Sequence, residues 1–118
     1  MRLGKALGAA ALILTFASPV AAHSLLLESA PAAGSTVAAP GRLTLRFNNR
    51  IEKALSRLRL VNERGEAQTL AVPVADGPAD RLTAALPALA PGAYRVEWQV
   101  LSTDGHIVRG RLSFRVAP

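Results

Sequence analysis

The sequence predicts an all-β domain, an antiparallel Greek-key β-sandwich or partly closed barrel of the immunoglobulin or cupredoxin kind. Three observations lead to this prediction. Apolar and polar residues alternate in short runs, turn signals rich in glycine and proline recur at steady spacing, and no segment has a convincing helical period. Seven or eight short strands in this pattern are typical of Greek-key folds.

The chain opens with the features of a Sec-type signal peptide. Arg2 and Lys5 precede an apolar stretch over 6–16, and small residues lead up to the bond after Ala22. The apolar stretch is shorter than the roughly 20 residues of a membrane-spanning helix, which disfavours a retained anchor. We therefore predict that residues 1–22 are a cleaved signal peptide, that the protein is periplasmic, and that residues 23–118 form one small domain.

The absence of cysteine and the distribution of positive charge indicate how this domain is stabilised and which partners it can have. The chain has no cysteine, so its stability must come from packing rather than from disulfides. The net charge is +6, but the arginines alternate with apolar residues instead of forming a block, and there is one Trp and one Tyr. This pattern is typical of the solvated face of a sheet, and we expect no nucleic-acid partner. We also expect the domain to be a monomer.

The first predicted strands follow the start of the mature chain. Residues 24–28 are interpreted as a strand that anchors the amino terminus, and a turn-rich loop over 30–35 follows. Residues 42–47 alternate strictly between polar and apolar side chains, as a half-buried strand does. Residues 48–56 are ambiguous between a helical turn and a connection, and we favour the connection.

The middle of the chain continues the pattern. Residues 57–62 alternate and lead through a hairpin turn at 63–66 into a strand over 67–74. A loop at 76–80 precedes another short strand over 81–86.

The last two strands are the clearest. Tyr94 follows a Pro-Gly turn and opens a strand, which resembles the tyrosine corner of Greek-key sandwiches. Side chains alternate between the two faces of a strand, and the alternation from Tyr94 onward places Trp98 among the inward, core-facing residues. The final strand, over 107–116, has apolar residues inward and arginines outward, with Gly110 interrupting the inward row.

The two histidines of the chain suggest a metal site. Cleavage after Ala22 makes His23 the first residue, so its amine and its ring Nδ1 can bind one ion together. Asp104 and His106 lie two residues apart between the last strands, and in extended geometry such residues face the same way. An Asp-Gly pair alone usually indicates only a turn. The metal site is inferred because the pair occurs together with a histidine at the predicted mature amino terminus. We predict that His23, Asp104 and His106 are metal ligands.

The type of ligand indicates the metal. Three nitrogens and a carboxylate without a thiolate suit Cu(II) in a tetragonal plane, whereas Zn(II) accepts similar ligands less tightly. The only sulfur is in Met1, which leaves with the signal peptide, so a Cu(I) site is not expected. We predict one Cu(II) per chain, released by acid because the amine and the imidazoles must be deprotonated to bind.

Several stretches are shared with one known family. They include His23, Ser29-Ala30-Pro31-Ala32-Ala33-Gly34, Tyr94-Arg95-Val96-Glu97-Trp98 and above all Ser102-Thr103-Asp104-Gly105-His106. With these, the mature chain resembles the CopC family of periplasmic copper-binding proteins. The resemblance implies a Greek-key β-barrel, a Cu(II) site formed by the amino terminus and ring of His23 with Asp104 and His106, and an inner-membrane copper transporter of the CopD kind as a partner.

Two departures from the family pattern stand out. Ile107 occupies a position where many members carry proline, a change that an extended backbone tolerates. The methionine-rich Cu(I) site of some members has no counterpart in this chain, so transfer of copper between two sites is not expected.

The function we expect is a Cu(II) carrier or buffer in copper homeostasis and resistance, without enzymatic activity. One alternative is a copper-brace oxidative enzyme, since polysaccharide monooxygenases also use a terminal histidine. Such enzymes need an open copper position and a broad substrate face, which a domain of this size with Asp104 as a ligand does not favour. The other alternative is a metal-free, immunoglobulin-like structural module.

Overall fold

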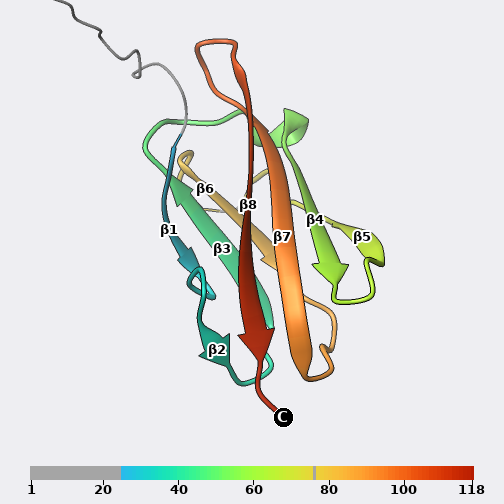
Figure 1. The fold of residues 1–118 in the computed structure, drawn as a ribbon. Helices are drawn as coiled ribbons and strands as arrows, with labels where there is room; N and C mark the ends of the chain where they lie inside the picture. The colour runs from blue at the N-terminus through green and yellow to red at the C-terminus, as the bar shows by residue number, and fades with distance from the viewer. Residues whose placement is uncertain (1–24, 76) are drawn as a thin grey trace, which may run out of the picture.

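The computed structural model describes residues 25–75 and 77–118, which form two β-sheets packed face to face (Figure 1). The first sheet has three strands in the order β1 (Leu26–Ala30), β3 (Arg42–Phe47), β6 (Arg81–Ala85). The second sheet has five strands in the order β2 (Thr36–Val37), β8 (Ile107–Val116), β7 (Gly92–Leu101), β4 (Arg57–Asn62), β5 (Ala67–Leu70). The predicted all-β, Greek-key-like sandwich is confirmed.

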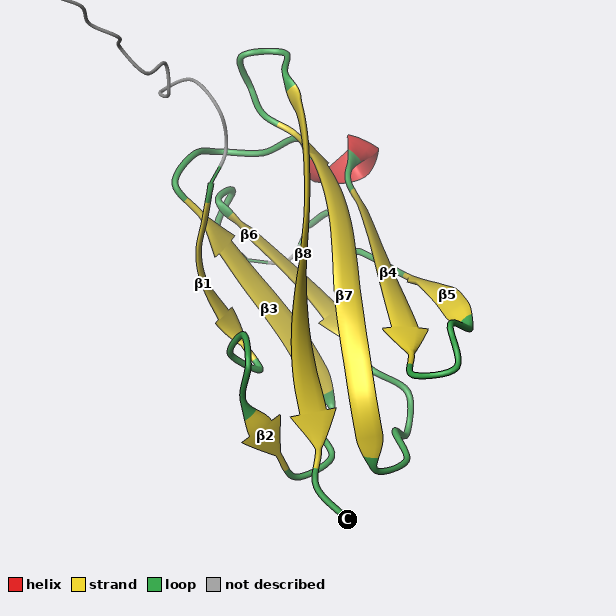
Figure 2. Ribbon diagram, viewed as in Figure 1, coloured by secondary structure: helices red, strands yellow, loops and turns green. Residues whose placement is uncertain are grey.

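Pairing within the sheets is antiparallel except at one edge. The two residues of β2 pair in parallel with the end of β8. The longest ladder joins β7 to β8 over ten residue pairs, from Gly92–Val116 to Leu101–Ile107. This hairpin contains the two longest strands of the larger sheet. Its connection, residues 102–106, projects from one end of the sandwich (Figure 2). No helix among the described residues is long and apolar enough to cross a membrane.

The core lies between the sheets and follows the predicted alternation. In β3 the apolar Leu43, Leu45 and Phe47 are at most 1% exposed, while the polar residues between them face out. Burying each such side chain contributes about 1.5–3 kcal/mol to folding. Trp98 is also buried, as predicted, and meets the ring of Phe47 edge to face at 6.2 Å.

The predicted tyrosine corner is present. The Tyr94 hydroxyl donates a hydrogen bond to the carbonyl oxygen of Ala90 at 2.6 Å, and the ring stacks on Phe114 at a centroid distance of 5.7 Å. The corner therefore fixes the start of β7 against the turn that precedes it.

Some predicted boundaries were wrong. The strand predicted over 24–28 runs from Leu26 to Ala30 among the described residues, and β5 ends at Leu70 rather than at residue 74. The second error has its cause in the partner strand, because β4 begins at Arg57 and the ladder ends with the pair Leu58–Leu70. Pro73, which has no N–H, also disfavours a longer strand. The ambiguous 48–56 segment is a connection containing one turn of 3₁₀ helix, η1 (Lys53–Leu55), and β2 was not predicted because two residues carry no alternation.

Candidate metal centre

The candidate centre is the loop that connects β7 to β8. The backbone N–H of Ser102 donates to the carbonyl oxygen of His106, and that of Gly105 donates to the carbonyl oxygen of Ser102, both at 2.9 Å. Gly105 has a φ of 92°, a left-handed conformation that favours glycine. These bonds close a tight turn in which Asp104 and His106 are held on either side of Gly105.

The side chain of Asp104 is held by hydrogen bonds from within the loop. Its Oδ1 accepts hydrogen bonds from the Ser102 hydroxyl and from the backbone N–H of His106 at 3.2 Å. The bond from Ser102 and, after it, the bonds from the ring and the backbone of His106 lower the pKa of Asp104 from 3.8 to about 2. The carboxylate is therefore ionised over the whole physiological range, as a metal ligand must be.

Asp104 and His106 lie side by side, as predicted, although a turn rather than the expected extended backbone brings them together. The Nδ1 of His106 is 3.1 Å from the Oδ1 of Asp104, and the two side chains are 56% and 37% exposed. Two neighbouring ligands of one ion, at bond lengths of about 2.0–2.1 Å and a right angle, are about 2.9 Å apart. This is a hydrogen-bonding contact between the two side chains, and it brings the imidazole and the carboxylate close enough to bind one metal ion together.

The loop is tied to the segment that follows β3. The backbone N–H of Thr103 donates to the carbonyl oxygen of Arg50 at 3.3 Å, and Ser102 forms an isolated bridge with Ile51. Ser102 is 1% exposed, so this side of the loop is part of the core. The candidate ligands therefore stand on a fixed base rather than on a free hairpin tip.

The same segment also holds the start of the described chain. The backbone N–H of Leu25 donates to Oδ1 of Asn48 at 2.7 Å, and the backbone N–H of Asn48 donates to the carbonyl oxygen of Leu25 at 2.9 Å. Residues 48–51 consequently contact both Leu25 and the 102–106 loop, and β1 begins at the end of the sandwich where that loop projects (Figure 1).

The predicted site residues have different outcomes. Asp104 and His106 are brought together, whereas His23 lies outside the described residues. The described part of the chain, residues 25–75 and 77–118, contains no group of three or more His, Cys, Asp or Glu side chains that could hold a metal. A complete centre built on this loop therefore requires a ligand from elsewhere, and the predicted one is His23.

Two supporting residues were missed in the sequence. Ser102 orients Asp104, and Asn48 fixes Leu25. The signal for Ser102 was its position two residues before an aspartate in a predicted turn, where a serine hydroxyl commonly bonds locally. Asn48 bonds to a residue 23 positions away, and no local pattern indicates such a contact.

The fold and the loop together place this protein in a class of small β-sandwich proteins. In this class the longest hairpin ends in a loop that presents an Asp-x-His pair of candidate metal ligands. The model of one family, described as the CopC domain, matches residues 26–117. The chain belongs to the CopC family, which confirms the resemblance found in the sequence.

Individual relatives agree with this assignment. Copper resistance protein C of Xanthomonas campestris pv. juglandis is 34% identical over 103 residues, 80% of each chain. Among solved structures, CopC from Methylosinus trichosporium OB3b is similar with a TM-score of 0.74 and 36% identity, over 81% of this chain and 95% of that one. PcoC, a methionine-rich copper resistance protein from Escherichia coli, has a TM-score of 0.68 and 31% identity, over 80% of this chain and 99% of that one.

Proposed function

We propose that this protein is a periplasmic copper-binding protein that holds one Cu(II) per chain and acts as a carrier or buffer in copper homeostasis and resistance. Membership in the CopC family and the names of the copper resistance relatives support the copper-related role. The observation that carries the proposal is the pairing of the Asp104 carboxylate with the His106 imidazole at 3.1 Å on an anchored loop.

The proposed ligands are the amine and ring of His23, with Asp104 and His106. His23 precedes Leu25 by two residues in the sequence, and two residues of chain span at most about 7 Å. Leu25 is itself held by two hydrogen bonds to Asn48, in the segment that also contacts the ligand loop. This short tether supports a site shared between the mature amino terminus and the β7–β8 connection.

The proposed oxidation state follows from the donor atoms. Nitrogen and carboxylate ligands suit Cu(II), whereas thioether and thiolate sulfur select Cu(I). The chain has no cysteine and a single methionine, Met1, which lies in the predicted signal peptide. In this respect it differs from PcoC, which is described as methionine-rich.

The proposal includes the processing and traffic of the protein. Residues 1–22 are removed on export, the domain over 23–118 is monomeric, and an inner-membrane transporter of the CopD kind exchanges copper with it. An oxidative enzyme is disfavoured, since Asp104 fills a copper position that oxygen activation needs. Oxidative cleavage of a polysaccharide in the presence of copper and a reductant would reverse this ranking.

The test is a Cu(II) titration of the protein that begins at His23, followed by electron paramagnetic resonance. The control is the same protein with one additional residue before His23, because a peptide bond there removes the amine ligand. One tight equivalent with nitrogen hyperfine structure, weakened in the extended form, supports the proposal. Equal affinity in the two forms contradicts the terminal-amine site.

The metal-free alternative is tested with single substitutions. Asp104→Asn and His106→Ala weaken Cu(II) binding if the proposed site is correct, while Thr103→Ala serves as a control in the same loop. If neither Asp104→Asn nor His106→Ala changes the affinity for Cu(II), these side chains are not the ligands. If the unmodified protein also shows no tight equivalent of Cu(II), the domain is a structural module rather than a copper protein.

A further inference from the structure

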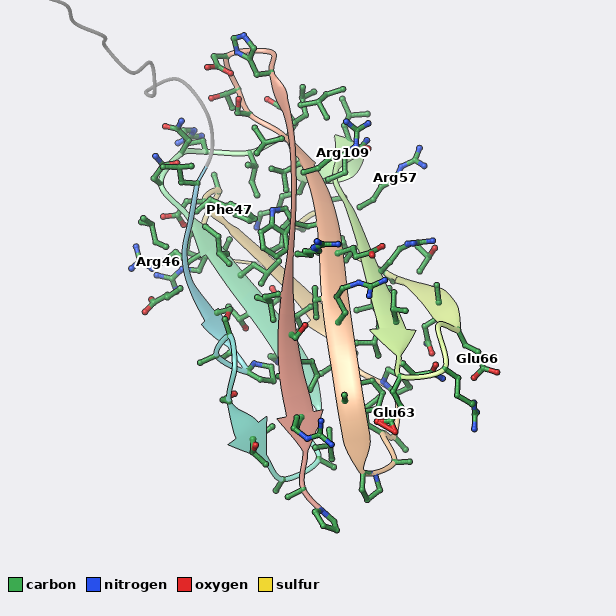
Figure 3. All side chains as sticks on the ribbon, viewed as in Figure 1. Arg46, Phe47, Arg57, Glu63, Glu66 and Arg109 are labelled. Carbon is green, nitrogen blue, oxygen red and sulfur yellow. The ribbon has the colours of Figure 1, made fainter. Side chains whose placement is uncertain are left out.

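The outer face of the larger sheet carries a groove lined by arginine. A cavity of about 680 Å³ lies over β4, β7 and β8, close to the end of the sandwich that bears the 102–106 loop (Figure 3). Arg57 and Arg59 of β4 form one wall, and Arg109 and Arg111 of β8 form the other. The floor is β7, with Glu97 and Gln99. We call this feature the arginine groove.

The charges of the groove are not balanced within the described chain. Glu97 is the only carboxylate in the lining, and it is already bound to Arg59 at 2.6 Å and, outside the lining, to Arg95 at 2.9 Å. Arg109 uses its Nε to donate to Gln99 at 3.0 Å. Over residues 25–75 and 77–118, neither Arg57 nor Arg111 has a carboxylate within ion-pair distance. The groove therefore keeps an excess of guanidinium donors for an anionic ligand.

The spacing of these arginines fits an extended chain. The register places Arg57, Gln99 and Arg109 in one row across the strands, and Arg59, Glu97 and Arg111 in the next. Neighbouring strands are about 4.8 Å apart, so the two walls are about 10 Å apart, and the rows are about 6.7 Å apart along the strands. An extended peptide repeats its side chains on one face at the same distance of about 6.7 Å.

We propose that the arginine groove binds an extended acidic segment of a partner protein, with carboxylates that meet the rows of arginines. Charge complementarity identifies the partner as acidic, and the matching repeat identifies it as an extended peptide. An anionic membrane fits less well, because surface binding to lipid combines cations with inserted apolar side chains. The exposed large apolar residues, Leu25, Leu27, Leu55, Val74 and Ile107, are all outside the groove lining.

This proposal is independent of copper binding, although the two features are neighbours. The row of Arg57, Gln99 and Arg109 is one row removed from the Leu101–Ile107 pair that closes the ligand loop. A segment bound in the groove therefore places its protein beside the candidate metal centre. The groove would still bind acidic peptide in a protein without metal, so each proposal can fail without the other.

The experiment measures binding of fluorescently labelled octaglutamate to the metal-free protein by anisotropy, at about 0.15 M ionic strength. The test variant combines Arg57→Gln, Arg109→Gln and Arg111→Gln. The matched control combines Arg42→Gln, Arg46→Gln and Arg81→Gln, which remove the same charge from the outer face of the smaller sheet. Thermal unfolding checks that both variants are folded.

The expected result is a loss of affinity of about tenfold or more in the groove variant and at most about twofold in the control, since three exposed contacts are lost in one and none in the other. Backbone amide shifts on adding the peptide should concentrate in β4, β7 and β8. Equal losses in both variants, or no binding of the peptide, would overturn the proposal. So would stronger binding to phosphatidylglycerol vesicles that depends on the same arginines, since the occupant would then be a membrane.

Discussion

The indole of Trp98 occupies the space that a side chain at Gly110 would fill. The two residues are directly paired between β7 and β8, and a Cβ added at Gly110 would lie 2.3 Å from Cζ2 of Trp98. Trp98 in turn meets the ring of Phe47 from the opposite sheet. The missing side chain in the inner row of β8 is therefore what allows the largest side chain of β7 to lie in the core.

Replacing Gly110 with alanine should destabilise the fold. The added methyl group must displace a ring that is packed between the sheets, and overpacking of this kind costs about 1–3 kcal/mol. Urea unfolding followed by Trp98 fluorescence measures the change. Gly41→Ala is the control, because a Cβ at Gly41 meets nothing within 4 Å. Equal stability of the two variants would contradict the packing described for Trp98.

The fold was predictable where side chains alternate. In β3 and β7 the apolar residues of the pattern are buried, with Tyr94 partly so, because a half-buried strand imposes a period of two on its sequence. The interruption at Gly110 was visible in the sequence, but its cause was not, since the Trp98 ring reaches it only through strand pairing. The parallel pairing of β2 with β8 was equally invisible, because two residues define no period.

The proximity of Asp104 and His106 was predictable from the sequence, whereas the contacts that support their loop were not. Asp104 and His106 were predicted to lie together from their two-residue spacing in extended geometry, and they do lie together, but a tight turn with a left-handed Gly105 places them there. The anchoring of the loop depends on Arg50 and Ile51, and that of Leu25 depends on Asn48, through contacts distant in sequence. Such contacts follow from how the sheets pack, which local patterns do not reveal. His23 lies outside the described residues, and its role stays a prediction.

Tyr94→Phe should lower stability modestly while keeping the fold. The variant loses the hydrogen bond from the hydroxyl to the Ala90 carbonyl but retains the ring stacked on Phe114. The expected cost is about 0.5–1.5 kcal/mol in the free energy of unfolding. Urea denaturation measures it, with the slope against urea unchanged. A variant as stable as the unmodified protein would show that the hydrogen bond from Tyr94 to Ala90 adds nothing to the free energy of unfolding.

Ser102→Ala should raise the pKa of Asp104. The Ser102 hydroxyl is the leading cause of the lowered value of about 2, so its removal moves the pKa toward the ordinary 3.8. Carbon-13 NMR titration of the Asp104 carboxyl in the metal-free protein measures the change. Thr103→Ala, an exposed neighbour in the same loop, should leave the titration unaltered. An unchanged Asp104 pKa in Ser102→Ala would refute the assigned hydrogen bond.

Glu97 should contribute to stability at neutral pH and lose that contribution in acid. Hydrogen bonds from Arg59 and then Arg95 lower the pKa of Glu97 below its ordinary value of 4.5. A carboxyl whose pKa is lowered by folding stabilises the fold above its unfolded value, and the contribution disappears as pH falls through the folded value. Between pH 5 and 2, the stability of Glu97→Gln should therefore decline less steeply than that of the unmodified protein. Glu52→Gln, which removes a carboxylate outside the described ion pairs, is the control.

Acid release of Cu(II) should be governed by the nitrogen ligands and not by Asp104. Because the pKa of Asp104 is about 2, its carboxylate stays ionised while free amines and imidazoles take up protons. Asp104→Asn should consequently lower the affinity for Cu(II) by a factor that is constant from about pH 7 to pH 4. Competition titrations with a chelator at several pH values give the two curves. Parallel curves fit the proposed ligand set, whereas curves that converge toward acid would mean that the Asp104 carboxylate itself is protonated as the copper leaves.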